Sequence, residues 1–253
     1  MPSNQMIFMG IDPCIQAGRV AYAVVSPELH PIAVGVDDLN SVVAIVEEQQ
    51  PVIIAVGAPP RLNQGIIVNP RRSAEKGFPP RRGRPMDCRV GEYELLQRGI
   101  DIYRTPSHAE KAKAWMQTGF TIYERLEAMG FRAFNGTPEG QQFIEVPPET
   151  CYWMWLEREP MAADKFEGRL QRQLVLYELG MDIPDPMLFL EEITRYRLLQ
   201  GNLPEVGLYT PAELQALAAA YIAWAVIQRP EEITFLGAVE EGQFAVPDKL
   251  ELG

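Results

Sequence analysis

Short apolar runs at the start of the chain predict a β-sheet. The first run ends on an acid, Asp12, and two further runs follow at hairpin spacing. A helical pattern then leads to a continuous apolar run, as expected for a central strand that is buried on both faces. We therefore predict strands over 6–12, 19–25 and 31–36, a helix over 41–50 capped by Asp37 or Asp38, and a central strand over 52–56.

Residues 57–106 contain many prolines and glycines, which predicts a loop or insertion at the mouth of the sheet rather than a core element. This segment includes a basic loop, 71–84, in which Glu75 is the only acid. Its positive residues are Arg71, Arg72, Lys76, Arg81, Arg82 and Arg84. Arginine suits phosphate because its planar group can donate two parallel hydrogen bonds. The alternative is a solvated loop that balances an acidic surface.

The rest of the chain is mostly helical in pattern. A capping box at 107–110 predicts a helix to Met129, and a second box, formed by Thr210 and Glu213, predicts a final helix to Gln228. Strands are predicted over 131–134, 143–146, 233–239 and 243–246, and helices over 148–158, 164–179 and 185–200. The expected fold is α/β, a mixed sheet flanked by helices. We expect one domain over 1–253, with a helical insertion over 148–200 before the final helix.

Composition narrows the possible chemistry. The chain has 253 residues and a net charge of −11, so nucleic acid would have to meet a local basic patch. Three dispersed cysteines, Cys14, Cys88 and Cys151, and only two histidines argue against a zinc site, a disulfide framework or a histidine-rich metal site. Neither a signal peptide nor a run of ~20 apolar residues is evident. We therefore expect a cytoplasmic protein without a membrane partner.

The order of several motifs resembles a known family. The motifs are GID at 10–12 followed by Gly18, VIIAVGAP at 52–59, RPMDCR at 84–89, FIEVPPE at 143–149, KFEG at 165–168, AELQALAAAYIA at 212–223, and Leu236-Gly237 to Pro247. In this order they resemble the uncharacterised family of predicted RNase H-like nucleases known as domain of unknown function 429. The resemblance implies an RNase H-like fold and phosphodiester hydrolysis assisted by two Mg²⁺ ions about 4 Å apart.

The chain departs from the family pattern at the acidic site. The resemblance implies an aspartate after the central strand and another in the final helix, where this chain has Gly57 and Gln215. Asp12 and Glu145 remain as candidate catalytic residues and metal ligands, and Glu213 is a third candidate ligand unless it only closes the capping box. Two carboxylates would hold Mg²⁺ or Mn²⁺ weakly or not at all. Asp12 could instead be a turn former before Pro13.

Two functional hypotheses stay open, and with them the question of whether the protein is an enzyme. The first is a metal-dependent nuclease with a reduced acidic site, in which Asp12 and Glu145 bind metal. Phosphate would then be held by Arg71, Arg72, Arg81, Arg82, Arg84 and Arg89. The second is a catalytically inactive RNase H-like relative that binds nucleic acid or a protein partner. Phosphotransfer to a small molecule is a third possibility, but no nucleotide-binding loop supports it.

Overall fold

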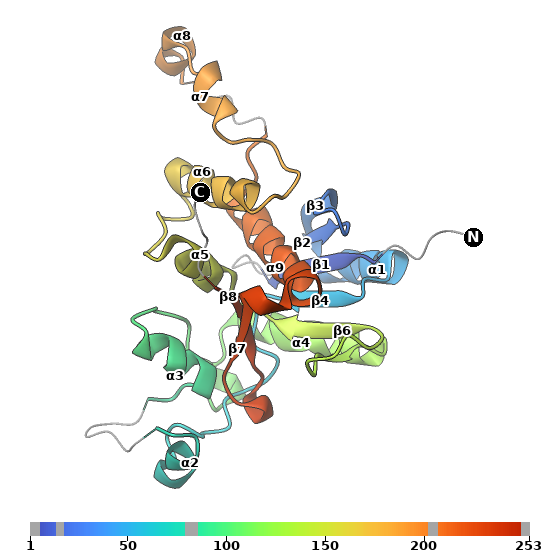
Figure 1. Cartoon of the computed structure of the whole chain (residues 1–253), viewed down its shortest axis with the longest axis vertical. Coiled ribbons are helices and arrows are strands. Elements are labelled where there is room, and N and C mark those ends of the chain that lie inside the picture. The colour runs from blue at the N-terminus through green and yellow to red at the C-terminus, as the bar shows by residue number, and fades with distance from the viewer. Residues whose placement is uncertain (1–5, 14–17, 79–85, 202–206, 249–253) are drawn as a thin grey trace.

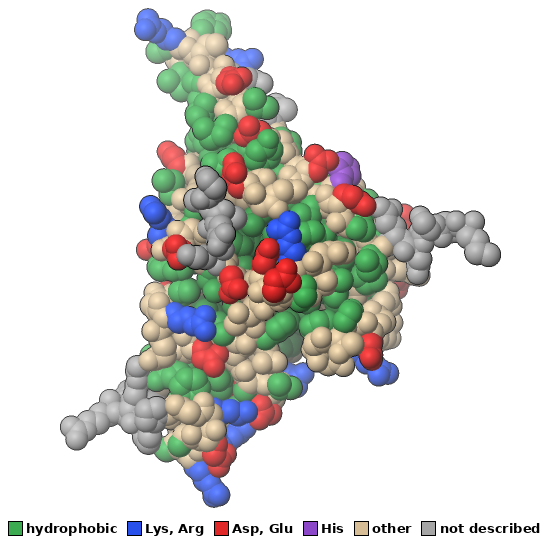
Figure 2. Space-filling model, viewed as in Figure 1, with side chains coloured by type: hydrophobic (Ala, Val, Ile, Leu, Met, Phe, Trp, Pro, Cys, Tyr) green, Lys and Arg blue, Asp and Glu red, His purple; other side chains and the backbone are tan. Residues whose placement is uncertain are grey.

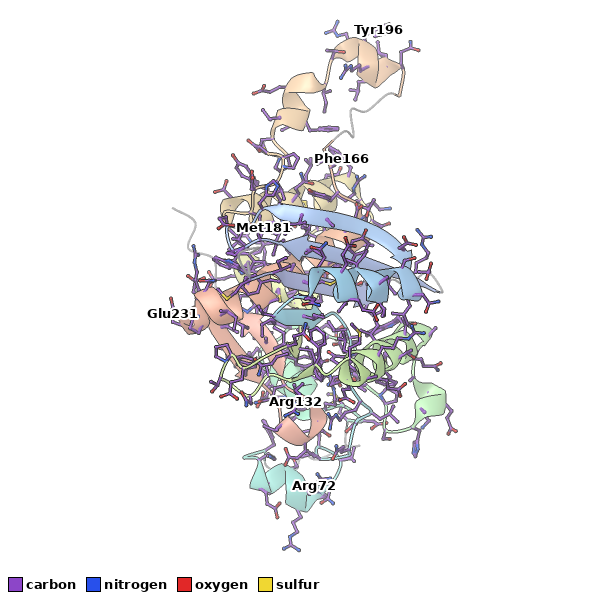
Figure 3. All side chains as sticks on the ribbon, turned by 90° about the vertical axis from the view of Figure 1, so that its right-hand side faces the viewer. Arg72, Arg132, Phe166, Met181, Tyr196 and Glu231 are labelled. Carbon is purple, nitrogen blue, oxygen red and sulfur yellow. The ribbon has the colours of Figure 1, made fainter. Side chains whose placement is uncertain are left out.

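The architecture is a central sheet with helices on both faces (Figure 1). The computed structural model describes residues 6–13, 18–78, 86–201 and 207–248. Figure 2 shows that the molecule is elongated, with a narrow projection at each end of its long axis. In Figure 3, which is turned by 90°, Arg72 and Tyr196 still mark the two opposite ends.

The sheet has eight strands in the described part of the chain, in the order β3-β2-β1-β4-β6-β8-β7, with β5 paired to β6. Strands β1 to β3 form an antiparallel meander, whereas β1, β4, β6 and β8 run parallel and β7 returns antiparallel to β8. The strands are β1 Phe8–Pro13, β2 Arg19–Val25, β3 Pro31–Asp38, β4 Ile53–Val56, β5 Arg132–Ala133, β6 Gln142–Glu145, β7 Ile233–Leu236 and β8 Phe244–Pro247.

Helix α9 (Pro211–Gln228) packs directly on one face of the sheet. A Cβ atom on Gly10 of β1 would lie 2.0 Å from the carbonyl oxygen of Ala216, so only glycine permits this close approach. Alanines along α9 keep the helix near the strands and bury almost its whole surface. Helices α5 (Pro148–Leu156) and α6 (Phe166–Glu178) complete the core on this face.

The opposite face is covered by α1 (Leu39–Gln49) and α4 (Ala114–Ala128). Asp38 caps α1, as the sequence predicts, by accepting hydrogen bonds from the amides of Asn40 and Ser41. The predicted α/β class, a mixed sheet flanked by helices, is therefore confirmed. The remaining elements are α2 Pro70–Glu75, α3 Val90–Gln97, η1 Ala109–Lys111, α7 Leu188–Glu192, α8 Arg195–Leu199, η2 Pro230–Glu232 and η3 Val239–Glu241.

Three local predictions are corrected. The capping box at 107–110 does not form, because the Ser107 hydroxyl donates to Asp87 and α4 begins only at Ala114. The helix predicted over 185–200 is two short helices, since Ile193 is extended and Thr194 caps α8 afresh. Part of the segment 57–106 belongs to the core, because α3 buries residues such as Leu95.

In the described residues, no helix has both the length and the apolar character needed to cross a membrane.

Candidate functional site

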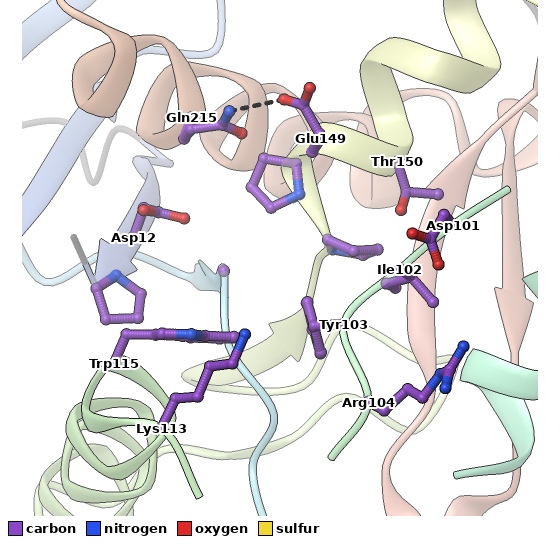
Figure 4. Close-up of a pocket in the computed structure, with 14 residues that line it drawn as sticks. Asp12, Asp101, Ile102, Tyr103, Arg104, Lys113, Trp115, Glu149, Thr150 and Gln215 are labelled. Atoms are coloured by element: carbon purple, nitrogen blue, oxygen red, sulfur yellow. Dashed lines mark hydrogen bonds between the residues drawn. The ribbon is translucent and has the colours of Figure 1, made fainter. Parts of the chain in front are cut away.

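A pocket of about 630 Å³ opens where β1 and β4 end (Figure 4). Parallel strands that share an edge present their carboxyl ends together, and ligands of α/β proteins commonly bind there. Its lining comprises Asp12, Pro13, Gly57, Asp101, Ile102, Tyr103, Arg104, Lys113, Trp115, Pro147, Pro148, Glu149, Thr150 and Gln215. The pocket is therefore lined by β1, by residues just after β4 and β6, by the N-terminal parts of α4, α5 and α9, and by the loop before α4.

Three positions that the sequence singles out meet in this pocket: Asp12, Gly57 and Gln215. A Cβ atom on Gly57 would lie 2.3 Å from Oδ2 of Asp12, so a side chain at position 57 would point at that carboxylate. Gly57 does not adopt a left-handed backbone, so its conformation does not itself require glycine. Of the three positions, only Asp12 carries an acid.

The fourth position, Glu145, lies on the other face of the sheet. Glu145 is level with Val56 on β4, which is level with Ile11 on β1, so these three side chains share one face. Ile11 and Val56 belong to the core under α1 and α4, whereas Asp12, one residue further along β1, faces α9. Tyr103 lines the pocket, and its hydroxyl donates a hydrogen bond of 3.1 Å to Glu145.

Arg89 neutralises Glu145 within the core. Its two terminal nitrogens donate to the two carboxylate oxygens of Glu145 at 2.6 and 2.8 Å, and its Nε donates to Glu92 at 3.0 Å. Arg89 is 1% exposed and a further bond goes to the carbonyl of Glu241. This corrects the expectation that Arg89 contacts phosphate, because its guanidinium is buried and hydrogen-bonded to two glutamates.

Asp12 is the carboxyl group most perturbed by the pocket. Burial, with a further contribution from the negative charge of Glu149, raises the pKa of Asp12 to about 7. Glu149 itself pairs with the buried Arg172 of α6 and accepts a 2.9 Å hydrogen bond from Nε2 of Gln215. That bond fixes the amide orientation and leaves the buried Oε1 of Gln215 without a hydrogen-bond partner among the described residues.

Glu213 does not join the pocket. Its carboxylate accepts a 2.8 Å hydrogen bond from the amide of Thr210, and the Thr210 hydroxyl accepts from the amide of Glu213. The predicted capping box is thus confirmed. Two residues along a helix correspond to a rotation of about 200°, so Glu213 points away from the side on which Gln215 lies.

The described part of the basic loop lies far from Asp12. Arg71 and Arg72 belong to α2, at the end of the molecule opposite α8 (Figures 1 and 3). Arg71 is 90% exposed and pairs with Glu75, and Arg72 donates to the carbonyl of Gln64. The other three arginines of the predicted phosphate site, Arg81, Arg82 and Arg84, lie outside the described residues.

Two cations of the pocket were missed from the sequence. Lys113 and Arg104 are exposed in its lining, and neither forms an ion pair or a side-chain hydrogen bond with a described residue. Trp115 lies beside Lys113 in Figure 4 and packs edge-on against Tyr103. A helix start at residue 114 would have placed Lys113 and Trp115 beside the pocket. The capping box predicted at 107–110 put the start of this helix too early.

The residues present do not fit a pair of Mg²⁺ ions. In the described part of the chain, no group of three His, Cys, Asp or Glu side chains is placed to hold a metal. Both carboxylate oxygens of Glu145 accept hydrogen bonds from Arg89. Glu149 forms an ion pair with Arg172 and accepts a hydrogen bond from Gln215. Magnesium needs several converging oxygen ligands with negative charge, and of the acidic positions that the resemblance implies only Asp12 offers it in this pocket.

Comparison with known proteins places the chain at the level of family. No curated protein and no solved structure matches it. Residues 10–241 match the model of a family described as "Protein of unknown function (DUF429)", and the chain belongs to that family.

Proposed function

We propose that this protein is an RNase H-like member of its family that binds a nucleic acid strand in the central pocket and does not hydrolyse it with metal ions. The observation that carries the proposal is the set of charges in this pocket. Two exposed cations, Lys113 and Arg104, form no ion pair or side-chain hydrogen bond with a described residue. Of positions 12, 57 and 215, only Asp12 is acidic. Fold alone does not assign a function, so the side chains of the site carry the proposal.

The order of elements supports the RNase H-like part of the proposal. Such a fold begins with a strand that ends in an acid, continues through a hairpin and a helix, and reaches a buried central strand. Here β1 ends at Asp12 and Pro13, β2 and β3 follow antiparallel, and α1 leads to the fully buried β4 beside β1. The convergence of positions 12, 57 and 215 is the geometry that the family resemblance implies for its acidic site.

The acidic positions of the site support binding of a strand without metal-assisted hydrolysis. Glycine and glutamine stand at two of the acidic positions. At the third, Glu145, both carboxylate oxygens accept hydrogen bonds from the buried, positively charged Arg89. Burial raises the pKa of Asp12 to about 7, so a substantial fraction of this carboxyl is protonated at neutral pH. A protonated carboxyl carries no charge, so Asp12 in that form does not repel a phosphate group.

The remaining lining supports a phosphate-bearing ligand with bases. Lys113 and Arg104 are charged and exposed, and cations without internal partners attract phosphate. Trp115 is half-buried in the same wall and offers an aromatic surface, and stacking on such a surface stabilises a single-stranded base by about 1–3 kcal/mol.

We expect Lys113→Ala with Arg104→Ala to weaken binding of unrelated single-stranded oligonucleotides about equally. The slope of log affinity against log salt should flatten by about 0.7 for each lost phosphate contact. Fluorescence anisotropy of a labelled oligonucleotide over a salt series measures both quantities.

The matched control is Arg71→Ala with Arg72→Ala, which removes the same charge from the far end of the molecule. This pair should leave the slope unchanged. If the slope flattens in the control and not in the pocket variant, phosphate is held by the basic loop and the proposed site is wrong.

A further inference from the structure

The end of the molecule formed by α7 and α8, residues 187–199, exposes an unusual concentration of apolar side chains; we call it the arm. Figure 2 shows hydrophobic side chains gathered at this end, which projects from the body in Figure 1. Six large ones are between 45% and 79% exposed. They are Met187, Leu188, Leu190, Tyr196, Leu198 and Leu199. Single exposed apolar residues need no explanation, but a contiguous group on one projection indicates an interaction surface.

Among the described residues, the arm is anchored to the body through α7. Phe189 of α7 is buried and its ring lies 4.4 Å from the ring of Phe166 on α6, measured between centroids. Helix α8 has five residues, none of them buried, and the Thr194 hydroxyl supplies its cap by accepting from the amide of Arg197. Isolated helices shorter than about 12 residues are marginal in water, so α8 needs a packing surface that the described body does not provide.

We infer that the arm is a dimer contact that packs against the arm of a second copy of this chain. Its charges are self-complementary. Segment 187–199 carries two glutamates on α7 and two arginines on α8, so its net charge is zero. A neutral apolar surface favours neither nucleic acid nor an anionic membrane, both of which select for excess positive charge.

Glu191 and Arg195 define the expected geometry. They are four residues apart, but Ile193 breaks the helix between them, and neither forms an ion pair with a described residue. A two-fold axis between two arms would bring Glu191 of each copy to Arg195 of the other, while the six apolar side chains cover one another. A self-complementary patch of this kind is what a two-fold dimer requires.

Sedimentation equilibrium of the full chain tests the inference without any ligand. We expect a concentration-dependent dimer, and Leu198→Asp with Leu199→Asp should raise its dissociation constant at least about tenfold. These side chains are exposed in the monomer, so circular dichroism should be unchanged. The control is Val239→Asp, the same kind of change at a site that is 75% exposed on η3, and it should leave the dimer intact.

The charge pair supplies a second, independent arm of the test. Glu191→Arg and Arg195→Glu should each weaken the dimer, and the two together should restore it. A native chain that is monomeric at every concentration, or a dimer that is insensitive to the arm variants, overturns the inference. Failure of the exchanged pair to restore the dimer overturns the proposed two-fold geometry. Capture of oligonucleotide by the arm instead of a second copy would also contradict it.

Discussion

Replacing Arg89 by alanine is expected to lower the free energy of unfolding by about 3–5 kcal/mol, because it leaves buried carboxylates without their counter-charge. Glu145 and Glu92 both take hydrogen bonds from this one guanidinium, and all three side chains are almost fully buried. Water cannot replace the lost partner without opening the core between α3 and β6. The effect should be smaller at acidic pH, where protonation removes the unpaired charge.

Urea denaturation of the native chain and the variant measures this difference. Arg98→Ala is the matched control, because Arg98 lies at the exposed end of the same helix, α3, and should cost no more than about 0.5 kcal/mol. A loss below about 1 kcal/mol in the Arg89 variant would show that the network is not the internal counter-charge described here.

Asp12→Asn is expected to stabilise the protein at neutral and alkaline pH. Burial and the charge of Glu149 raise the pKa of Asp12 to about 7, whereas an unfolded aspartate titrates near about 3.9. Between about pH 4 and 7 the folded chain therefore binds a proton that the unfolded chain has lost. This contribution to stability is complete at low pH and is lost as pH rises through that window.

The native free energy of unfolding should thus fall between about pH 4 and 7, and the Asp12→Asn substitution should remove that part of the fall. About three pKa units set a ceiling of about 4 kcal/mol, and partial exposure of Asp12 to the pocket reduces the expected value to about 2 kcal/mol. Denaturation at about pH 4.5 and about pH 8 measures it. Asp101→Asn, an exposed residue of the same pocket, is the control. Parallel pH profiles for the native chain and Asp12→Asn would contradict the prediction.

The sequence predicts most of the fold because hydrophobic periodicity sets the order of strands and helices. The family resemblance implies that positions 12, 57 and 215 belong to one acidic site, and the structure brings these positions together in one pocket. It does not reveal on which face Glu145 lies. A strand alternates faces with a period of two, and its phase depends on the register with β4, which the isolated motif does not contain.

The two capping boxes show why local motifs need their surroundings. At Thr210 the hydroxyl and Glu213 find each other's amides, and Pro211 favours a helix start. At 107–110 the same residue pattern forms no box, because the Ser107 hydroxyl instead donates a hydrogen bond to Asp87, which lies 20 positions earlier in the chain. A competing partner that is distant in sequence cannot be predicted from a short motif. The true start of α4, beside Lys113 and Trp115, therefore could not be placed from the sequence.

Binding of one labelled single-stranded oligonucleotide in chelator and in Mg²⁺, with its length checked afterwards, tests the central claim most directly. We expect an intact strand in both conditions and an affinity that does not require the metal. Mg²⁺ should only weaken binding somewhat, as any added salt does. Mg²⁺-dependent cleavage that disappears in Asp12→Asn would contradict the account, because it would show a working metal site despite Gly57, Gln215 and the Arg89–Glu145 pair.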